Sequence, residues 1–86
     1  MEKKLTAKRG DHAGGWYLTD TARNRCVNLN HSDWCLFDEE GRLAIDKDGR
    51  PYCWSTKSAA QWNAEYNRDW IAGYAERIDC PIKFSL

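Results

Sequence analysis

Four nitrogen and sulfur donors in the chain could together bind a metal ion: Cys26, His31, Cys35 and Cys53. Four such donors arranged as a tetrahedron form a structural zinc site. The donors are separated by four, three and seventeen residues, and the chain contains no Cys-x-x-Cys pair. Thiols in a reducing compartment normally stay free and act as small hydrophobic side chains. We therefore expect free cysteines and no bound metal or other cofactor, with this zinc site as an alternative.

Other patterns give little support for catalysis. The chain has two histidines: His12 lies in the predicted N-terminal arm, and His31 lies near Asp33 in a predicted loop. It holds neither a phosphate-binding loop nor a dinucleotide fingerprint. The stretch Asp46–Gly49 begins like a calcium loop, but the cation Arg50 occupies the fifth position, where a ligand is required. We therefore expect a protein that is not an enzyme.

The longest periodic stretch, Ser55–Ile78, predicts one long amphipathic helix in the C-terminal half. Ser55 or Thr56 can cap it by accepting hydrogen bonds from the first backbone N–H groups, and Pro81 prevents its continuation. Apolar side chains recur every three or four residues and fall on one stripe, which we expect to form the core. The stripe consists of Ala59, Trp62, Tyr66, Trp70, Tyr74 and Ile78.

The rest of the chain predicts short antiparallel strands. Trp16–Thr19 and Cys26–Leu29 form a first hairpin, and three further strands form a meander: Trp34–Phe37, Leu43–Ile45 and Tyr52–Trp54. Pro81–Leu86 alternates apolar and polar residues and predicts a last strand. The predicted fold is α+β, with an antiparallel meander sheet of about four to six short strands packed on one long helix. Residues 1–13 would be a flexible basic arm, and residues 14–86 a single domain.

A short internal echo marks two connections within this meander. Asp38-Glu39-Glu40-Gly41-Arg42 is followed by Asp46-Lys47-Asp48-Gly49-Arg50. An Asp that hydrogen-bonds its own backbone and a Gly that adopts positive φ are suited to tight turns. Two copies of this length are too few for a repeat protein. The echo therefore predicts the same turn twice.

Charge is balanced overall but unevenly distributed. Thirteen basic and thirteen acidic residues give a net charge of zero, whereas residues 1–25 carry +3 and residues 26–50 carry −3. A duplex-DNA binder usually has a basic excess. The basic arm nevertheless leaves nucleic-acid binding as an alternative through Lys3, Lys4, Lys8 and Arg9. The junction Trp54–Ala60, after three predicted strands, resembles the DNA-binding sheets of plant transcription factors and phage integrases, which implies a sheet-based nucleic-acid binder.

The leading expectation is a small protein-binding domain. Eleven aromatic residues exceed what one small core easily hides, and mixed charge at turns suits recognition of a protein. By analogy of size alone, such a domain could be a phage or mobile-element inhibitor of a host complex, of the anti-CRISPR or anti-restriction type. No membrane-spanning run or secretory signal is evident, so we expect a cytoplasmic protein. The expected partner-binding residues are Arg23, Arg25, Asp38, Glu39, Glu40, Arg42, Asp46, Asp48 and Arg50.

Overall fold

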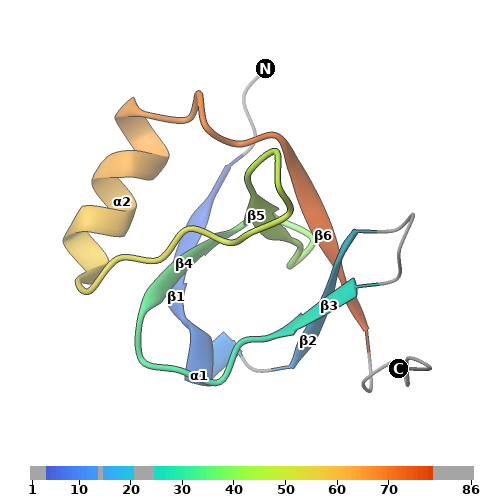
Figure 1. The fold of residues 1–86 in the computed structure, drawn as a ribbon. Coiled ribbons are helices and arrows are strands. Elements are labelled where there is room, and N and C mark those ends of the chain that lie inside the picture. The colour runs from blue at the N-terminus through green and yellow to red at the C-terminus, as the bar shows by residue number, and fades with distance from the viewer. Residues whose placement is uncertain (1–3, 14, 21–24, 79–86) are drawn as a thin grey trace.

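The computed structural model describes residues 4–13, 15–20 and 25–78, which form a curled antiparallel sheet with two helices (Figure 1). The six strands lie in the order β1-β4-β5-β6-β2-β3, and every neighbouring pair is antiparallel. The elements are β1 (Thr6–Arg9), α1 (Gly10–Ala13), β2 (Trp16–Asp20), β3 (Arg25–Asn28), β4 (Trp34–Phe37), β5 (Leu43–Ile45), α2 (Lys57–Tyr66) and β6 (Gly73–Ile78). None of the described helices is long and apolar enough to cross a membrane.

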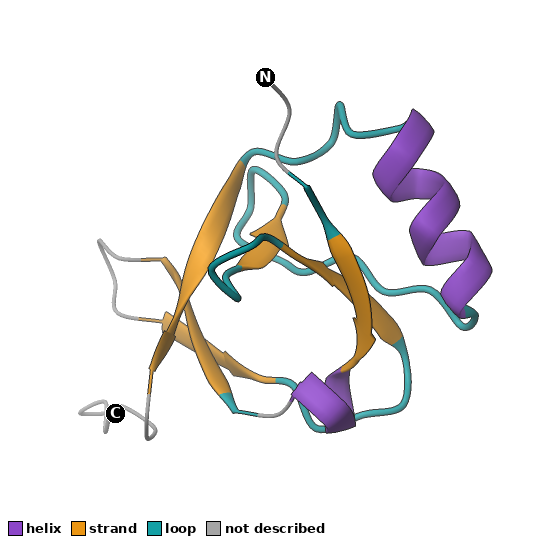
Figure 2. Cartoon of the chain, turned by 180° about the vertical axis from the view of Figure 1, so that it is seen from behind, coloured by secondary structure: helices purple, strands orange, loops and turns teal. Residues whose placement is uncertain are grey.

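Alternation along the strands separates the apolar side chains into two clusters. On β4, Cys35 and Phe37 belong to one cluster, whereas Trp34 and Leu36 contact the other. The first cluster comprises Tyr17, Leu29, Cys35, Phe37, Leu43 and Ala75. The second comprises Ala7, Leu36, Ala44, Ala60 and Ala64, the last two from α2, which lies outside the curl of the sheet (Figure 2). The sheet therefore has apolar packing on both faces.

The prediction of one long helix is wrong. The α2 helix is 10 residues long and ends at Tyr66, and Gly73–Ile78 is strand β6. Thr56 is the N-cap, since its side chain accepts from the Ala59 N–H. The β6 strand lies between β5 and β2, so its backbone groups find partners on both sides. Hydrogen bonds to two neighbouring strands stabilise the extended conformation here more than the helical spacing of the apolar residues favours a helix, since tertiary context overrides local preference.

The predicted apolar stripe also faces the wrong way on this helix. Ala60 and Ala64 are buried, whereas Trp62 and Tyr66 are 56% and 66% exposed. At about 100° per residue, the two aromatic residues lie nearly opposite the two alanines. Small side chains let the helix approach the sheet closely, and its large ones point outward.

The predicted strands are confirmed in part. The first hairpin is present as β2 and β3, and β4 and β5 have the expected bounds. The third meander strand is wrong, because Tyr52–Trp54 lies in a segment that makes only single bridges, Ile45↔Pro51 and Trp34↔Trp54. The expected strand Pro81–Leu86 falls outside the described residues. The segment expected as an arm contributes β1 and α1, and β1 pairs with β4.

The repeated turn predicted from the echo is confirmed. The backbone N–H of Asp38 donates to the Arg42 carbonyl and that of Asp46 to the Arg50 carbonyl, both at 3.0 Å. Gly41 and Gly49 have φ values of 81° and 80°, which only glycine adopts freely. The first turn connects β4 to β5, and the second connects β5 to the segment before α2.

Candidate functional site

Three of the four predicted zinc donors meet in space. Candidate ligand atoms of His31, Cys35 and Cys53 all lie within 4.8 Å of one another. The Cys35 and Cys53 sulfurs are 3.4 Å apart, and the Cys53 sulfur lies 4.0 Å from His31 Nε2. The side chain of Cys26 is outside the described part of the chain. We refer to these three residues as the His–Cys–Cys cluster.

Backbone pairing brings the two cysteines together. Trp34 and Trp54 exchange both of their hydrogen bonds, with N···O distances of 2.7 and 2.9 Å. In antiparallel pairing, the next opposed residues form a close pair without hydrogen bonds, and their side chains share a face of the sheet. Those opposed residues are Cys35 and Cys53. The bridge therefore places a buried thiol from β4 beside an exposed thiol from the segment that precedes α2.

Contacts with α1 hold the histidine in place. The backbone N–H of Gly10 donates to the Asp33 carbonyl at 2.9 Å, and that of Asp11 donates to the His31 carbonyl at 2.6 Å. A Cβ on Gly10 would lie 2.9 Å from both Cε1 and Nδ1 of the imidazole. His31 Nδ1 is buried and has no hydrogen-bond partner among the described residues. The opposite ring nitrogen, Nε2, faces the Cys53 sulfur.

The two thiols have opposite shifts in acidity. Their hydrogen bond lowers the pKa of Cys53 and raises the pKa of Cys35, and burial raises the latter further. The nearby charge of Asp33 raises the pKa of both cysteines. Cys53 is thus the better nucleophile and metal ligand of the two, because the thiolate is the reactive form. A cation between the sulfurs would offset the charge of Asp33.

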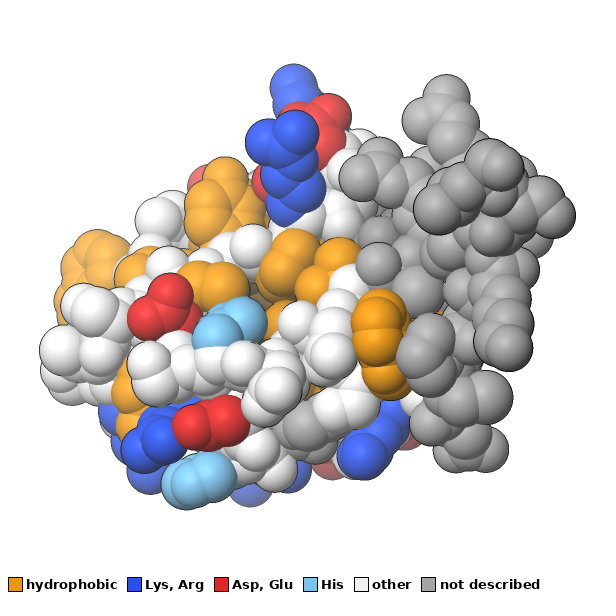
Figure 3. Space-filling view, turned by 60° about the horizontal axis from the view of Figure 1, so that its bottom comes forward, with side chains coloured by type: hydrophobic (Ala, Val, Ile, Leu, Met, Phe, Trp, Pro, Cys, Tyr) orange, Lys and Arg blue, Asp and Glu red, His pale blue; other side chains and the backbone are white. Residues whose placement is uncertain are grey.

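Figure 3 shows the α1 end of the molecule, where both histidine side chains are visible at the surface. Hydrophobic side chains lie along one side of one of them, and acidic side chains lie near both. Within the cluster, His31 is half-buried, Cys35 is buried and Cys53 is exposed. The cluster therefore runs from the apolar core to the solvent.

A second candidate surface is the outer face of α2. The rings of Trp62 and Tyr66 pack against each other with centroids 5.5 Å apart, and more than half of each side chain is exposed. A Trp and a Tyr one helical turn apart form a continuous apolar patch. We refer to these two residues as the aromatic pair. Large exposed aromatic residues of this kind are enriched at the centres of protein interfaces.

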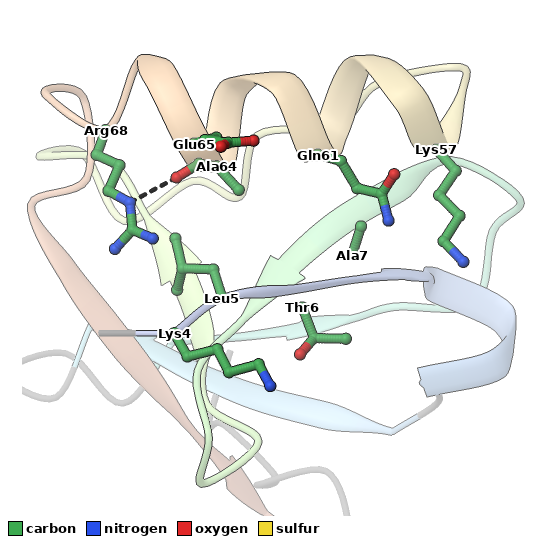
Figure 4. Close-up of a pocket in the computed structure, with 9 residues that line it drawn as sticks. All are labelled: Lys4, Leu5, Thr6, Ala7, Lys57, Gln61, Ala64, Glu65 and Arg68. Carbon is green, nitrogen blue, oxygen red and sulfur yellow. Dashed lines mark hydrogen bonds between the residues drawn. The ribbon is translucent and has the colours of Figure 1, made fainter. Parts of the chain in front are cut away.

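A groove of about 450 Å³ lies beside this helix, between α2 and the N-terminal strand (Figure 4). Lys4, Leu5, Thr6 and Ala7 line one side, and Lys57, Gln61, Ala64, Glu65 and Arg68 line the other. The guanidinium of Arg68 donates to the Ala64 carbonyl at 2.5 Å. In the described sheet β1 is an edge strand, and no residue of its neighbour β4 lines the groove.

Some of the predicted partner-binding residues form hydrogen bonds and ion pairs within the two turns, and others are exposed to solvent. Asp38 is only 4% exposed, and its carboxylate accepts from the Glu40 and Arg42 N–H groups and from the Arg42 guanidinium. Arg42 also pairs with Glu40 at 3.1 Å and Glu76 at 3.7 Å. Asp46 accepts two backbone hydrogen bonds in the second turn. Glu39, Asp48 and Arg50 are exposed, Arg23 lies outside the described residues, and so does the side chain of Arg25.

Two basic residues of the predicted arm, Lys8 and Arg9, lie in β1, and Lys4 precedes this strand. Lys4 lines the groove, Lys8 is exposed, and Arg9 forms an ion pair of 2.5 Å with Asp11. This pairing lowers the pKa of Asp11 and raises that of Arg9. Lys3 is outside the described residues. Sequence reasoning missed Gly10, Trp54 and the aromatic pair as contributors to these sites, because each depends on contacts between distant elements.

Comparisons with family models, with curated proteins and with solved structures found no match to this chain.

Proposed function

We propose that this chain is a small protein-binding domain whose contact surface is centred on the aromatic pair. The observation that carries the proposal is the exposure of Trp62 and Tyr66, at 56% and 66%, on a helix that buries only alanines. A folded domain gains no packing free energy from side chains that point away from its core. Burial of the same rings against a partner would contribute roughly 25 cal/mol per Å² of apolar surface.

The groove between α2 and β1 supports the same proposal. It lies beside an edge strand, where an extended segment of a partner can add backbone hydrogen bonds. Lys4, Lys57 and Arg68 line it together with the single acid Glu65, which favours a partner segment with acidic residues. The groove would then set the register, while the aromatic pair supplies apolar contact area.

The exposed charged residues of the two turns form a second surface that a protein partner could contact. Glu39, Asp48 and Arg50 remain candidates for contacts at the rim of an interface, where charge sets specificity and on-rate. Inhibition of a host complex by a phage or mobile-element protein is one use of such a domain. Binding of nucleic acid remains the alternative, and the experiment below separates the two.

The test compares protein capture from a lysate, with and without nuclease treatment, by the tagged wild-type chain and by a Trp62→Ala/Tyr66→Ala variant. We expect the double variant to retain its Tm and to lose at least about tenfold of the captured protein, because each anchor contributes roughly 1–2 kcal/mol. Ser58→Ala, on the exposed face of the same helix, is the matched control and should capture as well as wild type.

Two results would contradict the proposal. Equal capture by the wild type and the double variant would show that the aromatic pair is not a contact surface. Capture that disappears with nuclease, in wild type and control alike, would favour the nucleic-acid alternative. Sedimentation of the purified chain identifies the case in which the bound partner is a second copy.

A further inference from the structure

We propose that His31, Cys35 and Cys53 bind one thiophilic divalent metal ion, with Zn²⁺ as the physiological candidate. The ligand set consists of one imidazole and two thiols, a set that zinc sites commonly use. These donors come from the loop before β4, from β4 and from the segment before α2. A metal ion at this position would therefore link three parts of the chain, and it is independent of the proposed contact surface on α2.

The distances fit such an ion with little movement. In a tetrahedral site, Zn–S bonds of about 2.3 Å and Zn–N bonds of about 2.1 Å separate the ligand atoms by about 3.6–3.8 Å. The corresponding distances are 3.4 Å between the two sulfurs and 4.0 Å between the Cys53 sulfur and His31 Nε2. All three ligand atoms lie within 4.8 Å of one another. Small side-chain rotations suffice to bring them to one ion.

The surroundings hold the ligands in position before an ion binds. The Trp34–Trp54 bridge fixes the two cysteine backbones, and Gly10 packs against one edge of the imidazole. Ligands held in this way lose little conformational freedom on binding, and this raises affinity. The exposed Cys53 provides access from solvent, and water would complete the tetrahedron.

Charge and proton balance are also favourable. Binding of Zn²⁺ displaces the protons of the Cys35 and Cys53 thiols, which pass to solvent as two H⁺. Two thiolates and one neutral imidazole then leave the centre without net charge, next to the apolar cluster that contains Cys35. Affinity should therefore rise with pH, because the ligands must be deprotonated.

A disulfide is the competing use of the same two cysteines. The sulfurs are 3.4 Å apart, whereas a disulfide bond is about 2.05 Å long. Its formation would require an oxidant to accept two electrons and would remove both thiolate ligands. A reductant should abolish stabilisation by a disulfide but leave stabilisation by a metal unchanged, and the experiment uses this difference.

The experiment titrates Co²⁺ into the full chain, metal-free and fully reduced, in the absence of oxygen. We expect one equivalent to bind, with thiolate-to-cobalt charge-transfer bands and the visible bands of tetrahedral cobalt, and Zn²⁺ should displace it. Zn²⁺ at 100 times its Kd should raise Tm by on the order of 10 °C. Chelator should reverse this rise, while reductant should leave it unchanged.

Variants locate the site. Cys53→Ser and His31→Gln, at positions that are not fully buried, should each weaken Zn²⁺ binding by more than the roughly 100-fold typical of losing a residue that hydrogen-bonds a metal ligand. Cys80→Ser is the control for thiol number and should bind as wild type does. Absence of charge-transfer bands, equal affinity in Cys53→Ser, or an equal loss in Cys80→Ser would overturn the proposal. A stabilisation that appears with oxidant and vanishes with reductant would establish the disulfide instead.

Discussion

The rings of Tyr52 and Trp70 pack against each other, with their centroids 4.2 Å apart. Tyr52 lies before α2 and Trp70 lies after it, so this contact joins the segment that leads into the helix to the segment that leaves it. Trp54 joins the same cluster, 5.7 Å from Trp70. The helix is thus attached to the rest of the fold both by its alanine face and by an aromatic cluster formed by the segments before and after it.

The two tryptophans of the expected stripe should respond differently to truncation. Trp70→Ala removes a half-buried ring from this cluster, and we expect it to lower the free energy of unfolding by about 3 kcal/mol. Trp62→Ala removes an exposed ring and should change it by no more than about 0.5 kcal/mol. Urea denaturation followed by circular dichroism measures both. Similar losses in the two variants would show that Trp62 packs in the folded protein.

Asp38 should make stability depend on pH in the acid range. Burial alone would raise the pKa of Asp38, but hydrogen bonds from the Arg42 backbone and guanidinium and from the Glu40 N–H lower it below its usual value. A lowered folded-state pKa means that the ionised form is the stabilised one. Its contribution is therefore complete above about pH 4, the usual Asp pKa, and is lost as pH falls through the folded-state pKa.

Asp38→Asn should accordingly be less stable than wild type at neutral pH, by about 1–3 kcal/mol, and should lose less stability on acidification. Denaturation midpoints measured at pH values from neutral to strongly acidic test this. Asp46→Asn is the matched control, because the Asp46 carboxylate also accepts two backbone hydrogen bonds in the equivalent turn but is less buried. An unchanged acid dependence in Asp38→Asn would refute the assignment.

Gly10→Ala should disturb the His–Cys–Cys cluster from outside it. The added Cβ would lie 2.9 Å from the His31 ring and 3.0 Å from its carbonyl oxygen, so the loop must shift. We expect a loss of about 1–3 kcal/mol in stability, as for overpacking elsewhere, and a shifted imidazole resonance in NMR spectra. Gly41→Ala is the contrasting variant, because nothing lies within 4 Å of its Cβ and only the φ of +81° opposes it. If Gly10→Ala leaves the His31 resonances in place, Gly10 does not position the ring.

Features that depend on interactions between residues close in the sequence could be predicted from the sequence alone. The two turns, the N-cap at Thr56 and the strands β4 and β5 depend on residues that interact within a few positions, through hydrogen bonds and allowed φ values. For such features, the neighbouring residues supply both the preference and the partner.

Tertiary structure decided the remainder. Residues 73–78 carry apolar side chains at both helical and strand spacing, and the free edges of β5 and β2 select the strand. The same applies to the thiols: Cys35 and Cys53 are brought together by the Trp34–Trp54 bridge, which no spacing encodes. Which side of α2 is buried also depends on how closely the helix packs on the sheet. The small side chains of Ala60 and Ala64 fit at this contact, and Trp62 and Tyr66 are left exposed. Each outcome depends on backbone groups or surfaces distant in the chain, whose positions exist only after folding.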